Sequence, residues 1–254
     1  MSAMPNRPRL IAIASGKGGV GKTWFAITLA QALAARGGPV LLFDGDLGLA
    51  NVDVQLGLTP QHELGSVLSG RVSLAQAVLR HPEGGFDILP GSSGSGTLSG
   101  LDPASVEQIL SLLRGAGAYD TVLLDLGAGL ERGVRRMAAA ADTLLTIATE
   151  EPTSLTDAYA VMKLYANDAR QGDARILVNQ ATTHAAGLRT YETLRRACVS
   201  FLRLDPPLAG IVRRDDRVRD AIRRQSLLLV RHPTCAAAAD VEAIAAGLSQ
   251  RAAA

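Results

Sequence analysis

A segment near the start of the 254-residue chain has the residue types and spacing of a phosphate-binding loop. Residues 15–23 read SGKGGVGKT and match the pattern G-x-x-x-x-G-K-[ST]. Glycines allow successive main-chain N–H groups to point at phosphate oxygens, and the start of a helix adds positive charge to the same place. The Lys22 ammonium would reach the β- and γ-phosphates, and the Thr23 hydroxyl would bind Mg²⁺. We predict nucleotide binding by Gly16, Lys17, Gly18, Gly19, Val20, Gly21, Lys22 and Thr23.

Acidic residues follow two later apolar segments, where a phosphate-binding protein needs them. Asp44 and Asp46 follow the apolar residues 40–43, and Asp125 follows residues 121–124 in the pattern of a Walker B strand. Phosphoryl transfer needs oxygens that hold Mg²⁺ and a group that orients the attacking water. We predict that Asp46 orients this water, that Asp44 and Asp46 contribute to the metal shell, and that Asp125 holds Mg²⁺ beside the loop threonine. Alternatively, Asp44 and Asp46 cap a loop, because Asp favours turns.

Short apolar runs alternate along the chain with longer stretches of helical period. The apolar runs are continuous, which indicates strands buried on both faces, as in a parallel sheet. The alternation predicts an α/β fold with a doubly wound, mostly parallel sheet of seven or eight strands and helices on both faces. Together with the phosphate-binding loop at residues 15–23, this makes the expected fold a P-loop NTPase. Ligands in such sheets bind at the carboxyl ends of the strands. The predicted strands are residues 10–14, 40–43, 86–89, 121–124, 144–148, 176–178 and 208–212. The predicted helices are residues 23–35, 103–113, 131–140, 154–169 and 188–202.

Composition limits the class of protein. With 47% apolar and 20% charged residues the chain is not intrinsically disordered, and a net charge of +2 is too balanced for wholesale binding of nucleic acid. Cys198 and Cys235 are too far apart to form a metal cluster or a disulfide framework. We expect a single cytoplasmic P-loop ATPase domain over residues 1–254, flexible at 1–8 and 250–254. The Gly/Ser-rich residues 91–100 predict either a partner-contacting loop or a plain surface loop.

Lys17 is not needed to hold phosphates, because Lys22 already does so, and it points to a particular class. The string KGGVGKT resembles the deviant Walker A motif of the MinD/ParA class of dimerising ATPases. Five further segments resemble the FlhG/FleN (YlxH-like) flagellar number regulators within that class. They are DGDLGLANVDVQLGL at 44–58, DLGAG at 125–129, EPTSLTDAYA at 151–160, ILVNQ at 176–180 and AGIVRRDDRVRDAI at 209–222.

The resemblance implies an ATP-dependent switch with slow Mg-ATP hydrolysis that regulates flagellar number or placement. In the class, ATP binding forms a homodimer, and Lys17 would act catalytically on the partner's nucleotide. The alternative within the class is a MinD- or ParA-like ATPase that positions cell division, chromosomes or plasmids. A redox ATPase like the nitrogenase iron protein is excluded, because Cys198 and Cys235 lie in the wrong region for an iron–sulfur cluster.

The resemblance also implies contacts beyond the loop. Asn179 would read the adenine edge, although an Asn that caps a turn is an equal alternative, and Arg213 would line the other side of the base pocket. Implied partners are a flagellar transcription activator, the FlhF GTPase or switch-complex proteins. Residues 236–254 read as a packing helix more than a lipid anchor, which leaves peripheral contact with the inner face of the membrane open. The arginines between Arg213 and Arg231 favour a solvated helix face over a site for DNA, lipid or an acidic partner.

Overall fold

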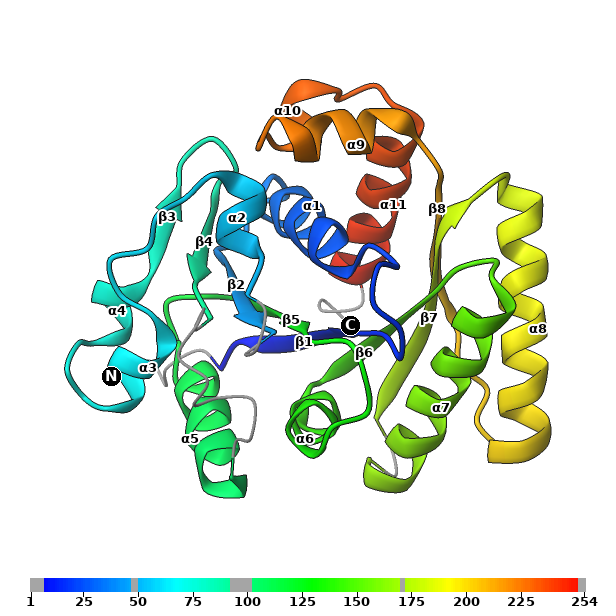
Figure 1. Ribbon diagram of the computed structural model, residues 1–254, viewed down its shortest axis with the longest axis horizontal. Helices are drawn as coiled ribbons and strands as arrows, with labels where there is room; N and C mark the ends of the chain where they lie inside the picture. Colours follow the sequence, from blue (N-terminus) through cyan, green and yellow to red (C-terminus); the bar gives the residue numbers. More distant parts are fainter. Residues whose placement is uncertain (1–6, 47–49, 92–101, 170–171, 251–254) are drawn as a thin grey trace.

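The computed structural model describes residues 7–46, 50–91, 102–169 and 172–250 (Figure 1). Within these ranges, eight strands form one sheet in the order β3-β4-β2-β5-β1-β6-β7-β8. The β3–β4 pair is antiparallel, and the other neighbouring strands are parallel. The strands are β1 (Arg9–Ala14), β2 (Val40–Gly45), β3 (Leu79–His81), β4 (Phe86–Leu89), β5 (Thr121–Leu126), β6 (Thr143–Ala148), β7 (Asp173–Ala181) and β8 (Leu208–Arg213). The mostly parallel, eight-stranded α/β fold is the predicted one.

Helices cover both faces of this sheet (Figure 1). Within the described residues they are α1 (Lys22–Ala34), α2 (Val52–Leu56), α3 (Leu64–Leu68), α4 (Leu74–Ala77), α5 (Pro103–Arg114), α6 (Arg132–Ala140), α7 (Pro152–Asp168), α8 (His184–Leu202), α9 (Asp216–Arg223), α10 (Leu228–Arg231) and α11 (Ala236–Gln250). Helices α5 to α8 contribute to the core on one face, whereas α1, α10 and α11 contribute to the core on the other.

Strand β1 shows why the apolar runs are continuous. Leu10 and Ala12 point into the core under α5 to α8, and Ile11 and Ile13 point into the core under α1 and α11. Because successive side chains of a strand alternate between faces, a strand covered on both sides needs apolar residues at every position. This strand lies between β5 and β6, so the loop that follows it emerges in the middle of the sheet edge.

The predicted elements are present, with shifted ends and some omissions. Each predicted strand segment lies within a strand, but β3 was not predicted, because three residues at a sheet edge carry no clear pattern. Helix α8 begins at His184 rather than at residue 188. It begins there because the Thr183 side chain caps it by accepting a hydrogen bond from the N–H of Ala186. The short helices α2, α3, α4, α9 and α10 were also missed. The loop predicted for the Gly/Ser-rich residues 91–100 lies outside the described residues, except for Gly91.

Helix α11 packs against α1 and β8, as the sequence predicted for a packing helix. Val241, Ile244 and Leu248 on one of its faces are all buried. Across the ranges that the structure describes, no helix combines the length and apolarity needed to cross a membrane. Cys198 and Cys235 are both buried and free, which agrees with the expectation that they form no disulfide.

Candidate nucleotide site

The phosphate-binding motif forms the turn between β1 and α1, with strand, loop and helix in the predicted order. Two of its glycines are required by close packing. A Cβ added at Gly16 would lie 2.4 Å from the carbonyl oxygen of Asp157 on α7. Gly21 has a φ of 87°, and a Cβ there would lie 2.6 Å from the side-chain nitrogen of Asn179. The loop is therefore held between α7 on one side and the end of β7 on the other.

Lys22 and Asp125 form the buried, charged centre of the site. Burial lowers the pKa of Lys22, while the nearby carboxylates of Asp125 and Asp46 raise it and offset part of this effect. Burial raises the pKa of Asp125 to about 7, and the charge of Asp44 adds to the rise, whereas Thr23 and Lys22 oppose it. Both carboxylate oxygens of Asp125 are buried with no hydrogen-bond donor at bonding distance among the described residues.

Asp44 and Asp46 follow β2 but have different surroundings. The Asp44 carboxylate accepts three main-chain N–H groups, from Asn51 at 2.9 Å, Val52 at 2.9 Å and Asp46 at 3.3 Å. Burial raises its pKa to about 6. These contacts match the loop-capping alternative, and a place for Asp44 in the metal shell stays a prediction. The Asp46 carboxylate lies against the segment after β5, since a Cβ at Gly127 would be 3.2 Å from its Oδ1.

The Lys17 ammonium is paired with residues at the start of α7. Its ammonium lies 2.6 Å from a carboxylate oxygen of Glu151 and 3.1 Å from the hydroxyl of Thr153. Both partners belong to the segment where α7 begins at Pro152. The predicted reach of Lys17 to a second subunit stays a prediction, and it requires that these contacts break.

The base side of the site contains Asn179 and Arg213, with contacts that the sequence did not indicate. The buried Asn179 amide donates to the Val20 carbonyl at 2.8 Å, and its oxygen accepts the N–H of Gln180 at 2.9 Å. The second contact is the turn-capping alternative, and the first clamps the phosphate-binding loop. The Arg213 guanidinium is paired with Asp240 on α11 at 2.8 and 2.9 Å. Adenine contacts of both residues stay predictions.

A cavity of about 260 Å³ lies beside these two residues. Its walls are Gly19 and Gly21 of the loop, Trp24 of α1, Asn179 and Gln180 at the end of β7, and residues of the 213–219 segment. The cavity continues from the phosphate-binding loop along the carboxyl edge of the sheet, where ligands of doubly wound folds bind.

Comparison with known proteins identifies the family. A family model described as the CobQ/CobB/MinD/ParA nucleotide binding domain matches residues 11–228. The chain belongs to this family. Within it, the antiactivator FleN of Pseudomonas aeruginosa is 37% identical over 240 residues, which cover 93% of this chain and 85% of FleN. The flagellum site-determining protein YlxH of Helicobacter pylori is 29% identical over 222 residues, which cover 87% of this chain and 74% of YlxH.

A solved member of the family has the same fold. The septum site-determining protein MinD of Pyrococcus horikoshii, complexed with Mg-ADP, superposes with a TM-score of 0.80 over 96% of this chain and 97% of that chain, at 24% identity. The predicted membership of the MinD/ParA class is therefore confirmed, together with the resemblance to FleN and YlxH within it.

The residues present fit a nucleotide-bound Mg²⁺. Within the described ranges, no group of three or more His, Cys, Asp or Glu side chains is placed to hold a metal ion. The two unpaired oxygens of Asp125 and the nearby Thr23 hydroxyl are the kind of oxygen ligands that Mg²⁺ takes when phosphates and water supply the rest.

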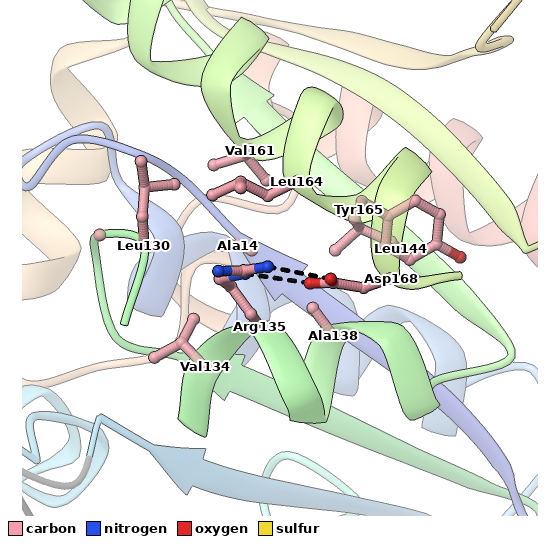
Figure 2. Close-up of a pocket in the computed structure, with 11 residues that line it drawn as sticks. Ala14, Leu130, Val134, Arg135, Ala138, Leu144, Val161, Leu164, Tyr165 and Asp168 are labelled. Carbon is pink, nitrogen blue, oxygen red and sulfur yellow. Dashed lines mark hydrogen bonds and ion pairs between the residues drawn. The ribbon is translucent and has the colours of Figure 1, made fainter. Parts of the chain in front are cut away.

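A second pocket, between α6 and α7, is too small for a nucleotide (Figure 2). It has room for about 20 Å³, which corresponds to roughly one water molecule. Apolar side chains such as Val134 and Val161 line it, and the Arg135 guanidinium forms two hydrogen bonds of 2.9 and 3.0 Å with the Asp168 carboxylate across it. The side chains that line this pocket pack α6 against α7.

Sequence reasoning missed Glu151, Thr153 and Trp24 as parts of the site. Glu151 and Thr153 lie in the EPTSLTDAYA segment, which was used only as a mark of resemblance. Their contact with Lys17 spans more than a hundred residues of sequence, so no spacing rule indicates it. Trp24 directly follows the motif, and its bulk at that place was the available signal.

Proposed function

We propose that this protein is an ATP-dependent dimerising switch that hydrolyses Mg-ATP slowly and regulates the number or placement of flagella. The observation that carries this proposal is the likeness to the antiactivator FleN over 93% of the chain. The likeness to the flagellum site-determining protein YlxH supports the same function. The ATP-dependent part is supported by the buried charged centre next to the phosphate-binding loop.

The chain's own residues supply distinct parts of the proposed cycle. Main-chain N–H groups of the loop and the Lys22 ammonium bind the phosphates. Thr23 and Asp125, with Asp44 and Asp46 as the other predicted members of the metal shell, would hold Mg²⁺, which would neutralise charge on the phosphates. Asp46, next to Lys22, orients the water that attacks the γ-phosphate, as predicted from the sequence.

Lys17 connects the two subunits of the proposed dimer. In the dimer it leaves Glu151 and contacts the nucleotide of the second subunit, where its charge stabilises the transferred phosphate. A Lys17→Ala variant is expected to bind ATP and stay monomeric in light scattering. An Asp46→Ala variant is expected to dimerise with ATP and not to dissociate, because hydrolysis is blocked. Normal dimerisation of the first variant would remove Lys17 from the mechanism, and normal turnover of the second would remove Asp46.

The cellular role is tested by deleting the gene in its host and counting flagella per cell by electron microscopy. An altered number or position, restored by the wild-type gene and not by Lys17→Ala, is the expected result. Unchanged flagellation would contradict the regulatory role. Proposed partners are a flagellar transcription activator, the FlhF GTPase or switch-complex proteins. Pull-downs with the monomeric Lys17→Ala and the trapped Asp46→Ala proteins identify which partner prefers the dimer.

A positioning ATPase of the MinD or ParA kind is the second candidate, supported by the shared fold and the family. The arginines Arg214, Arg217, Arg219 and Arg223 are exposed around α9. Arg231 is exposed as well and pairs with Asp220 at 2.6 Å, which fits the solvated helix face that we favour. Strong ATP-dependent retention on non-specific DNA, lost at raised salt, would favour the second candidate. We do not assign membrane attachment to α11, because its apolar face is buried against the protein.

A further inference from the structure

Trp24 has a position that the proposed function does not explain. It is the only tryptophan in the sequence and lies in the first turn of α1, directly after Thr23. Only 7% of its surface is exposed, and it belongs to the core between α1 and the sheet. The same side chain also lines the 260 Å³ cavity beside Asn179. Trp24 therefore joins the apolar core to the inner wall of the candidate base pocket.

The indole N–H of Trp24 lacks a partner. Among the residues that the structure describes, no acceptor lies within hydrogen-bond distance of its Nε1, and the atom is shielded from solvent. Buried tryptophan N–H groups usually donate a hydrogen bond, and a buried donor without one destabilises the protein. An unpaired buried donor requires an explanation, and an acceptor on a bound ligand is one explanation for a donor on a residue that lines a cavity.

The location of the cavity indicates which part of a ligand would reach it. Phosphates held by the loop amides leave the attached sugar and base to continue past Gly19 and Gly21. The cavity is slightly smaller than the roughly 300–1,000 Å³ of whole small-molecule sites, which suits part of a nucleotide whose phosphates lie on the loop. An aromatic wall also suits a base, because bases stack on aromatic rings.

We propose that Trp24 is a nucleoside-binding residue: its ring forms a wall for the base and sugar of the bound nucleotide, and its indole N–H donates to an acceptor on that part of the ligand. The inference rests on the proposed binding of ATP at the loop and adds a contact that is separate from the phosphates. It predicts that Trp24 contributes to the affinity for nucleotides and not to the affinity for phosphate chains without a base.

Isothermal titration calorimetry with two probes tests this prediction. Mg-ATP occupies the loop and the cavity, whereas inorganic tripolyphosphate with magnesium occupies only the loop. Trp24→Phe keeps an aromatic ring at this position and removes the N–H, and it is expected to weaken ATP binding by about 2- to 12-fold. Trp24→Leu removes the ring and is expected to weaken it by about 5-fold or more. The affinities of the wild type and the two variants for tripolyphosphate are expected to agree within about twofold, because this probe has no base or sugar for Trp24 to contact.

Two results would overturn the inference. One is that both variants bind ATP like the wild type. The other is that both probes weaken together, which would assign Trp24 to the folding of the loop. If the wild type binds tripolyphosphate but no ATP, or neither probe, the proposed function fails before the Trp24 contact is tested by substitution, so the two failures are distinguishable.

Fluorescence gives a readout that needs no variant. Because Trp24 is the only tryptophan, the emission of the wild-type protein reports this side chain alone. We expect Mg-ATP to change the emission with the affinity measured by calorimetry, and tripolyphosphate to leave it nearly unchanged. Equal emission with and without saturating Mg-ATP would overturn the proposed contact even if the variants fail to fold.

Discussion

Glu151 holds Lys17 in the single subunit, so a change at Glu151 tests the proposed dimer directly. The Lys17 ammonium lies 2.6 Å from the Glu151 carboxylate, and Thr153 adds a contact at 3.1 Å. If Lys17 reaches the nucleotide of a second subunit, the pair with Glu151 must break in each subunit. Glu151→Gln removes the charge and keeps the size of the side chain, so it weakens the contact that competes with dimerisation.

The size of the effect follows from the exposure of the pair. The Lys17 and Glu151 side chains are 39% and 65% exposed, so water and salt screen their attraction. Such exposed pairs contribute about 0.2–1 kcal/mol each. Two pairs break per dimer, for a total of about 0.4–2 kcal/mol, which raises the dimer association constant by about 2- to 30-fold in Glu151→Gln. The difference from the wild type shrinks at high salt.

Analytical ultracentrifugation with saturating Mg-ATP, in an Asp46→Ala background that blocks hydrolysis, measures this constant. Glu150→Gln is the matched control, because Glu150 is the adjacent carboxylate and accepts the N–H and hydroxyl of Thr182, the N–H at 2.7 Å. We expect the control to dimerise like the parent protein. An association constant for Glu151→Gln that equals the control would refute the competition, and a lower one would show that Glu151 supports the dimer instead.

Three further predictions concern the loop, the buried acids and α11. The pKa values of Asp125 and Asp44, about 7 and about 6, lie above the ordinary 3.8. The folded state therefore keeps protons that the unfolded state has lost, and the unfolding free energy of the nucleotide- and magnesium-free protein should fall as pH rises from about 4 to about 7. Asp125→Asn should reduce this decrease of the unfolding free energy with pH, as measured by urea denaturation at several pH values. An unchanged pH dependence would contradict the raised pKa of Asp125. Gly16→Ala should lower the unfolding free energy by about 1–3 kcal/mol, because the added Cβ clashes with Asp157 on α7. Gly18→Ala is the control and should be tolerated, because no atom lies within 4 Å of the Cβ added there. Equal melting temperatures for these two variants would argue against the close packing. Asp240→Asn should lower the unfolding free energy by about 1–2 kcal/mol, because the carboxylate pairs with the Arg213 guanidinium and accepts its main-chain N–H; no loss of stability would mean that packing alone holds α11.

Local patterns were enough to predict the sheet and the phosphate-binding loop. The apolar residues of β1, the glycines after it and the strand that carries Asp125 near its end are each encoded within a few neighbouring positions. Burial on both faces of a parallel sheet leaves a continuous apolar run that is visible without any knowledge of the partner strands. The predicted closeness of Thr23 and Asp125 then follows from the strand order, because β1 and β5 are neighbours.

Side-chain partners that are distant in sequence could not be predicted in this way. Asn179 clamps Val20 across 159 positions, and Lys17 meets Glu151 across 134 positions. The role of Asp44 depends on where the chain returns at Asn51 and Val52, which the turn-forming residues alone do not decide. A carboxylate at a strand end has the same sequence pattern whether it caps a loop or holds a metal, so only its neighbours in space separate the two roles.

The contacts place one link between the loop and the rest of the molecule at the start of α7, in addition to the Asn179 clamp at the end of β7. Gly16 packs against the Asp157 carbonyl in the first turns of this helix, and the partners of Lys17 lie at its N-terminus. A change in the loop on nucleotide binding therefore acts on α7 through two adjacent contacts, one steric and one charged. Closely packed elements transmit such shifts because they cannot absorb them. Helix α11 is tied to β8 by the pair of Arg213 and Asp240. If partners distinguish the monomer from the dimer, the Glu151→Gln and Gly16→Ala variants should alter partner capture.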